Sequence, residues 1–247
     1  MADLHISLTA EKIFELGPVV VTNSMFTGWI VTLAISLLLL SIVSSFRKVP
    51  SGIQTLFEGV FSFIYGTVRD ILGEPITSRL FPLLFSFFLF IMFGSWAGLL
   101  PGAGTVGFFE ENHGEKTAVP VFRAVTADIN TAIALALITF FVIEYYGFKQ
   151  NGLGYLKKFF VFSSPIGFFV GILEFISEIM RIVTFSFRLF GNIFAGEVIL
   201  AVMLWLAGFL VFPFLAFELF VGIIQGLVFV MLTTVFISLA VEKVDHH

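Results

Sequence analysis

Residues 185–197, FSFRLFGNIFAGE, decide the fold of this chain because they place the guanidinium of Arg188 inside an apolar run that reaches from about Pro165 to Leu210. A charge at bilayer depth costs roughly 2.5–3.5 kcal/mol on insertion scales, so an ionisable residue inside a membrane segment is by default a functional hypothesis. Arginine cannot relieve that cost by losing its proton. Arg188 therefore requires a partner that compensates its charge.

The composition is that of a polytopic membrane protein. Hydrophobic residues make up 58% of the 247 residues and charged residues 12%, whereas soluble domains carry about 25% charged residues. The mean hydropathy is +1.06. The sequence contains no cysteine, which excludes disulfides, thiolate metal sites and cysteine nucleophiles. The net charge of −4 is too small to indicate a class of partner.

Five hydrophobic stretches are long enough to cross a bilayer, for which about 20 residues suffice. We expect these transmembrane helices at 24–46, 80–100, 127–148, 165–207 and 212–240. An outer N-terminal lead occupies 1–23, and a polar outer loop occupies 102–126. Asp128 and Asn130 are expected to cap the N-terminus of the third span. The sequence thus predicts an all-α integral membrane protein that forms a single membrane domain over 1–247.

Residues 51–73 differ from these spans in their pattern. Apolar residues recur at helical spacing from Ile53 to Leu72, while Glu58, Arg69 and Asp70 lie elsewhere on the helix. This pattern is typical of an amphipathic helix that lies in the membrane interface. A helix that packs on a partner would show the same pattern, so that alternative stays open.

The apolar run around Arg188 contains no loop signal before Ala207 and Gly208. A continuous helix of about 42 residues is about 63 Å long. Because the hydrocarbon core is about 30 Å thick, such a helix must be steeply tilted. The alternative is a pair of spans with a turn near Arg188.

The distribution of basic residues favours the single tilted helix. With the N-terminus outside, eight basic residues fall on the inner side and three on the outer side, the asymmetry expected of a membrane protein. The inner residues are Arg47, Lys48, Arg69, Arg79, Lys149, Lys157, Lys158 and Lys243, and the outer residues are Lys12, Lys116 and Arg123. Two spans would instead carry Lys243 to the outer side.

The long helix carries polar residues on two faces. One face holds Glu174, Ser177, Glu178, Arg181, Thr184, Arg188 and Asn192. Glu197 lies on the opposite face. If the last two helices run antiparallel about Ala207 and Gly208, Glu197 lies level with Glu218, and Arg188 lies level with Gln225. Glu174 and Glu178 are too far along the helix to reach Arg188, so we expect its counter-charge to come from another subunit.

The pair of glutamates indicates proton transfer. Glu197 and Glu218 cannot both stay ionised cheaply in a site of low dielectric, so one of them should hold a proton. Beside water, such a pair is a suitable proton relay. The alternative is that the two side chains hydrogen-bond each other and pin the helices together. The acidic loop around His113 could suggest a metal site, but we interpret it as a solvated run of charges and predict no metal or cofactor.

RLFGNIFAGE (188–197), preceded by ILEFISEIMRIVTFSF and followed by FELFVGIIQGLVFVMLTTVFISLAVE (217–242), resembles subunit a of F-type ATP synthases. The resemblance is strongest over the last third of the chain, and the order of the earlier spans agrees with it. It implies a non-catalytic stator subunit that provides two offset proton half-channels to the carboxylates of a rotating c-ring. Arg188 matches the essential arginine of the family, which attracts the deprotonated ring carboxylate and blocks a proton short-circuit.

The resemblance also implies roles for other residues. The positions of Glu197, Glu218 and Gln225 line the outer proton route and the surroundings of the arginine. Asn192 matches the polar asparagine of the motif. Glu174 and Ser177 match positions towards the inner route, and we assign Glu178 to the proton path with them. Some relatives have histidine in place of one of the two glutamates, whereas this chain has glutamate at both positions.

The implied partners are the c-ring, the peripheral-stalk subunit b, other synthase subunits, protons and the lipid bilayer, without nucleic acid. The implied location is an energy-coupling membrane, the bacterial inner membrane or the mitochondrial inner membrane, with the N-terminus outside and the C-terminus inside. A sodium-coupled version of the same machine would carry the same residues.

Two other functional classes are compatible with charge inside a membrane protein. A stand-alone ion channel or secondary transporter would also bury charge inside the membrane, but it should conduct alone, whereas subunit a should require the c-ring. A membrane-embedded enzyme would need a catalytic motif, and neither HExxH nor GxSxG occurs in the spans.

Overall fold

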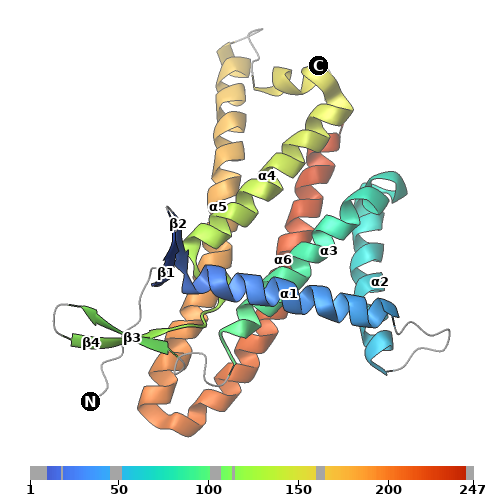
Figure 1. Ribbon diagram of the computed structural model, residues 1–247. Coiled ribbons are helices and arrows are strands. Elements are labelled where there is room, and N and C mark those ends of the chain that lie inside the picture. The colour runs from blue at the N-terminus through green and yellow to red at the C-terminus, as the bar shows by residue number, and fades with distance from the viewer. Residues whose placement is uncertain are drawn as a thin grey trace.

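The computed structural model describes residues 10–17, 19–44, 52–100, 107–112, 115–159 and 165–242. This part of the chain is predominantly helical (Figure 1). Its α helices are α1 (Asn23–Ser44), α2 (Gly52–Leu72), α3 (Glu74–Ala97), α4 (Ile129–Asn151), α5 (Pro165–Ala207) and α6 (Val211–Val241). Five of them, all except α2, are long and apolar enough to cross a membrane. The predicted all-α membrane fold is therefore confirmed.

The long helix α5 runs without a break through Arg188 and the rest of RLFGNIFAGE. The alternative of two spans with a turn near Arg188 is therefore wrong. A short 3₁₀ helix, η3 (Gly208–Leu210), reverses the chain into α6. The resulting hairpin is held by Phe185, whose ring centroid lies 5.0 Å from that of Phe229 and 5.7 Å from that of Phe236. Figure 1 shows the turn of this hairpin at the bottom of the view.

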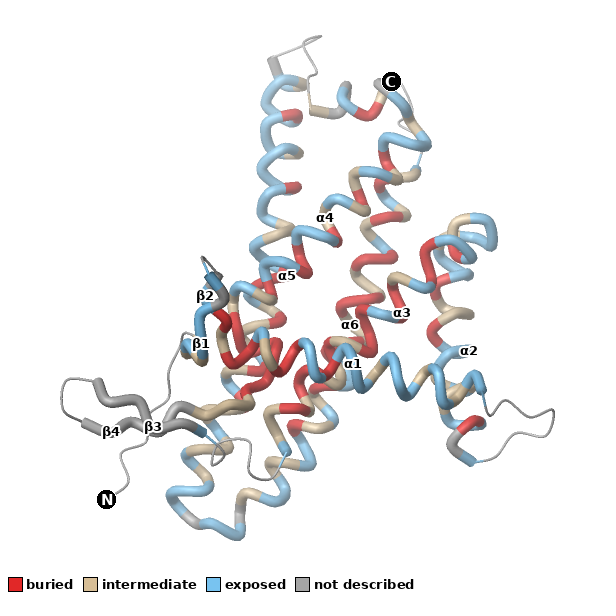
Figure 2. The backbone as a smooth tube through the Cα atoms, in the orientation of Figure 1, coloured by how far each residue is buried: buried red, intermediate tan, exposed pale blue. Residues whose placement is uncertain are grey.

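The hydrophobic core is centred on α3 and α6. Its fully buried side chains include Leu84, Ile91, Phe229 and Val230, and Figure 2 shows buried segments along the middle of both helices. Gly226 lets the helices approach closely, because a Cβ there would lie 3.0 Å from the carbonyl oxygen of Phe88. Trp96 adds a polar anchor by donating from Nε1 to the carbonyl of Leu219 at 2.9 Å.

The helices α1 and α2 lie at the edge of this core. Most side chains of α1 are exposed, and its buried residues fall between Asn23 and Val31. In Figure 1, α1 runs across the general direction of α5. If α1 crosses the bilayer along its normal, α5 is steeply tilted, as its length requires. The helix α2 packs on α3, with the Phe61 and Phe81 rings edge to face at 4.8 Å; its interfacial location stays a prediction.

Short β hairpins occur in the two segments that the sequence predicts to lie outside the membrane, for which no strands were predicted. β1 (Lys12–Leu16) pairs with β2 (Val19–Thr22), and β3 (Gly107–Asn112) pairs with β4 (Glu115–Pro120), both antiparallel. Gly17 has a φ of 62°, a conformation that suits a tight turn after β1 and that glycine adopts without strain. The 3₁₀ helices η1 (Val125–Ala127) and η2 (Gly152–Lys158) flank α4. Arg47, Lys48, His113 and Lys243 lie outside the described residues.

Candidate functional site

Arg188 lies half-buried on α5 beside a small polar pocket. The pocket has a volume of about 270 Å³, and Ser177, Arg181, Thr184 and Phe236 also line it. Within the described ranges, Arg188 makes no hydrogen bond and no ion pair. The guanidinium is therefore available to a group that this part of the chain does not supply.

Gln225 on α6 is bonded to Asn192 of α5. The Asn192 Nδ2 donates to the Gln225 Oε1 at 2.7 Å. The sequence placed Gln225 level with Arg188, but the structure pairs it one helical turn further along α5. The prediction is displaced by one turn because it assumes that the two helices are straight and parallel. The crossing of the helices shifts the level at which their side chains meet.

Glu218 lies directly against the backbone of α5. Its carboxyl contacts Gly196 so closely that a Cβ at that position would overlap it. Glu218 is 7% exposed, and within the described residues its Oε1 and the Nε2 of Gln225 are buried without a hydrogen-bond partner. Together with Asn192, these two side chains supply the polar part of a pocket of about 510 Å³ between α5 and α6. The sequence predicted that Glu218 lies level with Glu197 in an antiparallel hairpin, and the structure places Glu218 against Gly196, the residue before Glu197.

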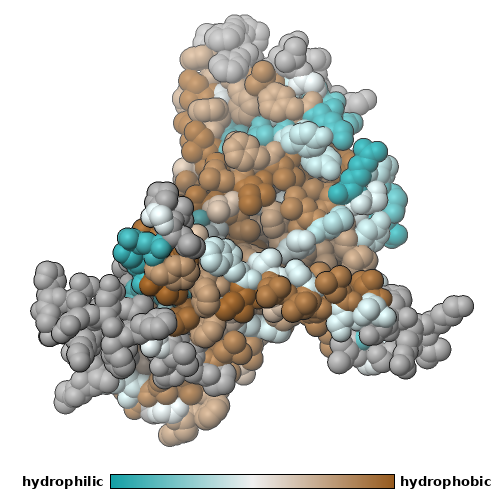
Figure 3. Space-filling model, in the orientation of Figure 1, coloured by the Kyte–Doolittle hydropathy of each residue, from teal (hydrophilic) through white to brown (hydrophobic). Residues whose placement is uncertain are grey.

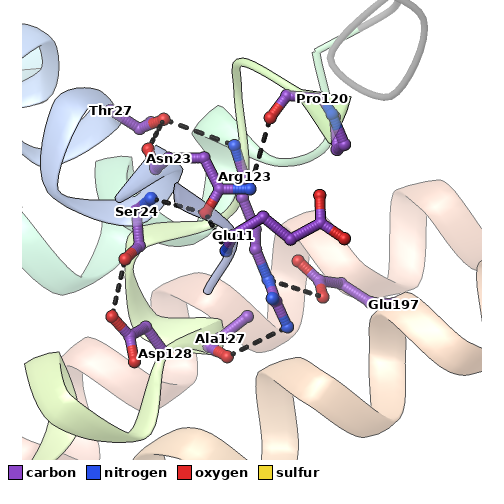
Figure 4. A network of polar contacts seen from close by, with 9 residues as sticks. All are labelled: Glu11, Asn23, Ser24, Thr27, Pro120, Arg123, Ala127, Asp128 and Glu197. Atoms are coloured by element: carbon purple, nitrogen blue, oxygen red, sulfur yellow. Dashed lines mark hydrogen bonds and ion pairs between the residues drawn. The ribbon is translucent and has the colours of Figure 1, made fainter. Parts of the chain in front are cut away.

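Glu197 meets a basic residue from a distant part of the chain. The Arg123 Nε lies 3.9 Å from the Glu197 Oε2, and the side chains are 9% and 25% exposed (Figure 4). The Arg123 Nη2 also donates to the carbonyl of Ala127 at 3.4 Å. Figure 4 shows the carboxyl of Glu11 directed towards the same region as that of Glu197. The site therefore gathers acidic groups around one buried cation.

A network of polar contacts fixes Arg123 in place (Figure 4). The backbone N–H of Arg123 donates to the Thr27 Oγ1 at 3.3 Å, and the Asn23 Nδ2 donates to the carbonyl of Pro120 at 3.2 Å. We call these contacts, together with the Ser24–Asp128 hydrogen bond of 2.6 Å, the outer clasp. The outer clasp ties the start of α1 to the segment that precedes α4.

Asp128 has two functions at this point of the fold. One oxygen of its carboxyl accepts from Ser24, and the other accepts from the backbone N–H of Asn130 at 3.0 Å. The second contact is the N-cap of α4 that the sequence predicted. Asp128 therefore joins the outer clasp to the N-terminus of α4, the third predicted span.

Arg123 is the site residue that sequence reasoning missed. It was counted among the basic residues of an outer loop, although the structure buries it against Glu197. A signal was present in the stretch AVPVFRAVTA (118–127), where Arg123 stands among apolar residues as Arg188 does. A charged residue in such surroundings indicates burial with a partner.

The residues assigned to an inner route lie on the first half of α5. Glu178 forms an ion pair with Arg181 at 2.6 Å, and the guanidinium carbon of Arg181 lies 4.1 Å from the centroid of the Phe236 ring. Ser177 lines the pocket of Arg188, whereas Glu174 is half-buried one turn before Glu178. The structure thus brings Ser177 and Arg188 together and leaves Glu197 and Glu218 at a separate position further along α5.

This arrangement places charged and protonatable side chains along one hairpin of apolar helices. Two pockets lie at different positions along the α5–α6 hairpin, one of them lined by Arg188, and each combines titratable or hydrogen-bonding groups with an apolar wall. Among the described residues, no group of three or more His, Cys, Asp and Glu side chains could hold a metal ion. The site therefore offers protonatable carboxyls and a fixed cation as its chemical groups.

Comparisons with known proteins agree with this arrangement. The family model described as ATP synthase A chain matches residues 25–238. ATP synthase subunit a 2 of a Bradyrhizobium species is 34% identical over 239 residues, which cover 96% of this chain and 96% of the relative. ATP synthase subunit a of Gloeobacter violaceus is 36% identical over 236 residues, covering 95% and 90%. The Helicobacter pylori protein of the same description is 32% identical over 246 residues, covering 96% and 99%.

Proposed function

This chain belongs to the ATP synthase A chain family, and on that premise we propose that it is the proton-conducting stator subunit of the synthase membrane sector. In this role it provides two offset half-channels that deliver protons to, and collect them from, the carboxylates of a rotating ring of c subunits. The subunit itself catalyses no reaction on nucleotide. It is a multi-pass membrane protein that associates with other subunits of the synthase.

Arg188 carries the proposal. Its guanidinium has no ion-pair partner among the described residues and is half-buried at the edge of a pocket. A fixed cation of this kind suits a carboxylate that arrives from another subunit, because the charge favours the ionised form of that carboxylate. Each ring carboxyl would release its proton as it meets Arg188 and would take up another proton after it passes.

The outer half-channel is assigned to the pocket and the clasp on the second half of α5. Glu197 and Glu218 would relay protons towards the ring, with Arg123 holding Glu197 in position. Asn192 and Gln225 would line the last step before the ring, since they border the pocket that also contains Glu218. The arrangement of Glu197 opposite Arg123 argues against the alternative in which the two glutamates pin the helices by bonding each other.

The inner half-channel is assigned to the first half of α5. Ser177 shares a pocket with Arg188, and Glu174 and Glu178 continue the polar face towards the start of the helix. Because Arg181 neutralises Glu178, we expect Glu174 to contribute more to proton exchange than Glu178 does. The proposed location is the bacterial inner membrane, with subunit b of the peripheral stalk as a further partner.

Replacement of Arg188 tests the proposal. In membrane vesicles that contain the assembled synthase, Arg188→Ala should abolish ATP-driven proton pumping and should make the membrane leak protons. Arg188→Lys should fail as well, because lysine lacks the planar guanidinium and can lose its proton. The matched control is Arg69→Ala on α2, whose ion pairs with Asp70 and Glu74 lie at the surface. Normal pumping by Arg188→Ala membranes that contain wild-type amounts of the subunit would overturn the proposal.

The glutamate pair is tested separately. Glu197→Gln and Glu218→Gln should each slow passive proton flux through the membrane sector while the subunit still assembles, because an amide cannot carry the proton. Proton flux is measured after removal of the catalytic sector, with immunoblots as the assembly control. Wild-type flux in both variants would show that the carboxyls serve packing.

A further inference from the structure

A further groove lies between α3 and α4. It has a volume of about 380 Å³, and its walls are apolar along Leu83, Ile138, Phe141 and Val142. Phe141 is 66% exposed and Ile138 is 46% exposed. Because α3 and α4 both pack on α6, the groove between them opens towards the surroundings of the bundle.

One end of this groove is basic and aromatic. Arg79 of α3 lines it together with Tyr145 and Tyr146 of α4. The ammonium of Lys149 lies 5.6 Å and 5.8 Å from the centroids of these two tyrosine rings. Two cations and two phenol groups therefore meet where α3 begins and α4 ends.

These cations are not neutralised by the described part of the protein. Neither Arg79 nor Lys149 has a carboxylate partner there. The acidic residue that begins α3, Glu74, is engaged instead by Tyr65, whose hydroxyl donates to it at 2.7 Å, and by Arg69 at 4.0 Å. Among the described residues, the basic end of the groove therefore has no paired carboxylate.

The groove is therefore complementary to an amphipathic molecule whose long axis lies along the bilayer normal, with apolar walls for its chain and a basic end for its headgroup. Figure 3 shows hydrophilic side chains gathered over the ends of α3 and α4, next to a broad hydrophobic surface. Tyrosine and basic residues near helix ends are typical of the level of lipid headgroups. Basic pockets between membrane helices are suited to anionic phosphate groups of lipids.

We propose that the groove between α3 and α4 binds one anionic phospholipid, with its phosphate between Arg79 and Lys149 and an acyl chain along Leu83, Ile138 and Phe141. The tyrosine hydroxyls supply neutral hydrogen bonds to the headgroup. This assignment requires that the chain spans a bilayer and is independent of the proton path. It also gives a specific ligand to Arg79 and Lys149, two of the eight basic residues predicted to lie on the inner side of the membrane.

Charge complementarity selects this occupant over the others. A hydrophobic helix of another protein would cover Phe141 but would leave both cations unpaired. Free phosphate would pair with the cations but would leave the apolar walls uncovered. A zwitterionic lipid would fill the groove, but its headgroup would bring a third cation beside Arg79 and Lys149.

The binding experiment uses the full chain, delipidated in mild detergent and followed by native mass spectrometry. The chain is titrated with dioleoyl-phosphatidylglycerol and, in parallel, with dioleoyl-phosphatidylcholine, which has the same acyl chains. We expect the anionic lipid to bind at least tenfold more tightly. Since one basic residue near a membrane surface contributes about a factor of five, Arg79→Gln with Lys149→Gln should weaken phosphatidylglycerol binding about 25-fold.

Three matched variants complete the test. Arg79→Lys with Lys149→Arg keeps both charges and should retain the preference for the anionic lipid, as should Arg69→Gln on α2. Ile138→Trp fills the apolar part of the groove and should weaken both lipids. Equal affinity of the parent chain for the two lipids, or an unchanged preference in the neutralised double variant, would overturn the proposal. Displacement of the lipid by an equal concentration of inorganic phosphate would overturn it too, because it would indicate a site for free anions.

Discussion

Arg123, Arg181 and Arg188 all lie against the α5–α6 hairpin, but their partners differ. Arg181 is satisfied within its own helix by Glu178, and Arg123 meets Glu197 across helices. Arg188 has no such partner among the described residues. A cation that is paired with a carboxylate of its own chain has a structural role. A cation inside the membrane without such a partner is expected at a site where a carboxylate of another subunit supplies the opposite charge.

The Arg123–Glu197 pair should contribute to stability as well as to the proton path. Removing one partner of a buried ion pair leaves the other uncompensated, so Arg123→Gln should destabilise the folded chain by about 1–3 kcal/mol. At about 2–4 °C per kcal/mol for a chain of this size, the unfolding midpoint should fall by roughly 5 °C. The midpoint is measured by thermal unfolding of the full chain in detergent.

The control for this prediction is a closer but exposed pair. Lys12 and Glu15 lie 2.6 Å apart, with side chains that are 49% and 56% exposed, so Lys12→Gln should leave the midpoint unchanged. The double variant Arg123→Gln with Glu197→Gln should recover part of the loss, because it removes the uncompensated carboxylate. If Arg123→Gln and Lys12→Gln behave alike, the buried pair does not stabilise the fold.

At the level of elements, the position of α6 depends on small residues that face α3. Gly226 and Gly222 leave room for Phe88 and Trp96, and close approach of this kind is typical of helix interfaces in membranes. The rigid neighbour at Gly226 is a backbone carbonyl, which cannot rotate away as a side chain can. The separation of α3 and α6 is therefore fixed at this point.

Gly226→Ala should disturb this interface. The added methyl group would lie 3.0 Å from the carbonyl oxygen of Phe88, so α3 and α6 must move apart, at a cost of about 1–3 kcal/mol. Gly59→Ala on α2 is the matched control, since a Cβ there meets nothing within 4 Å, and it should stabilise its helix slightly. Equal unfolding midpoints for the two variants would contradict the prediction.

The hydrophobic pattern was sufficient to predict α5 and α6, but it did not fix their contacts. The uninterrupted apolar run predicted the long helix, and a single turn at Ala207 and Gly208 predicted the antiparallel hairpin. The level of Gln225 was displaced by one turn, since the crossing of two helices depends on how their side chains interlock. The valine-rich segment of β2 formed a strand because its β-branched residues favour extended backbone, and periodicity over so few residues gives no clear signal.

At the level of the whole molecule, the site combines elements that are distant in the sequence. Glu197 is positioned by Arg123, and Arg123 is in turn held by Thr27 at the start of α1. A pattern within one helix identifies the face that is polar, but it does not identify the loop that folds back onto that face. For this reason Arg188, Glu197 and Glu218 could be predicted from the sequence as candidate residues, while the partner of Glu197 could not.

The orientation of the chain can be tested directly because the sequence contains no cysteine. In right-side-out vesicles, a membrane-impermeant maleimide should label Val20→Cys in the exposed strand β2 and should not label Glu242→Cys at the exposed end of α6. Gln150→Cys at the end of α4 should be labelled only after the vesicles are opened. This result follows from the proposed orientation, because five spans that begin with the N-terminus outside leave the C-terminus inside. Labelling of Glu242→Cys in sealed vesicles would reverse the proposed orientation of the last helix.

The outer clasp also sets an order of events during synthesis of the chain. Ser24 and Asp128 are 104 residues apart in the sequence, so the first helix must wait until the ribosome has completed the segment before α4. At about 5–20 residues per second, this interval lasts about 5–20 seconds. Glu197 is synthesised about 70 residues after Asp128, so it is the last residue of this polar network to join the chain.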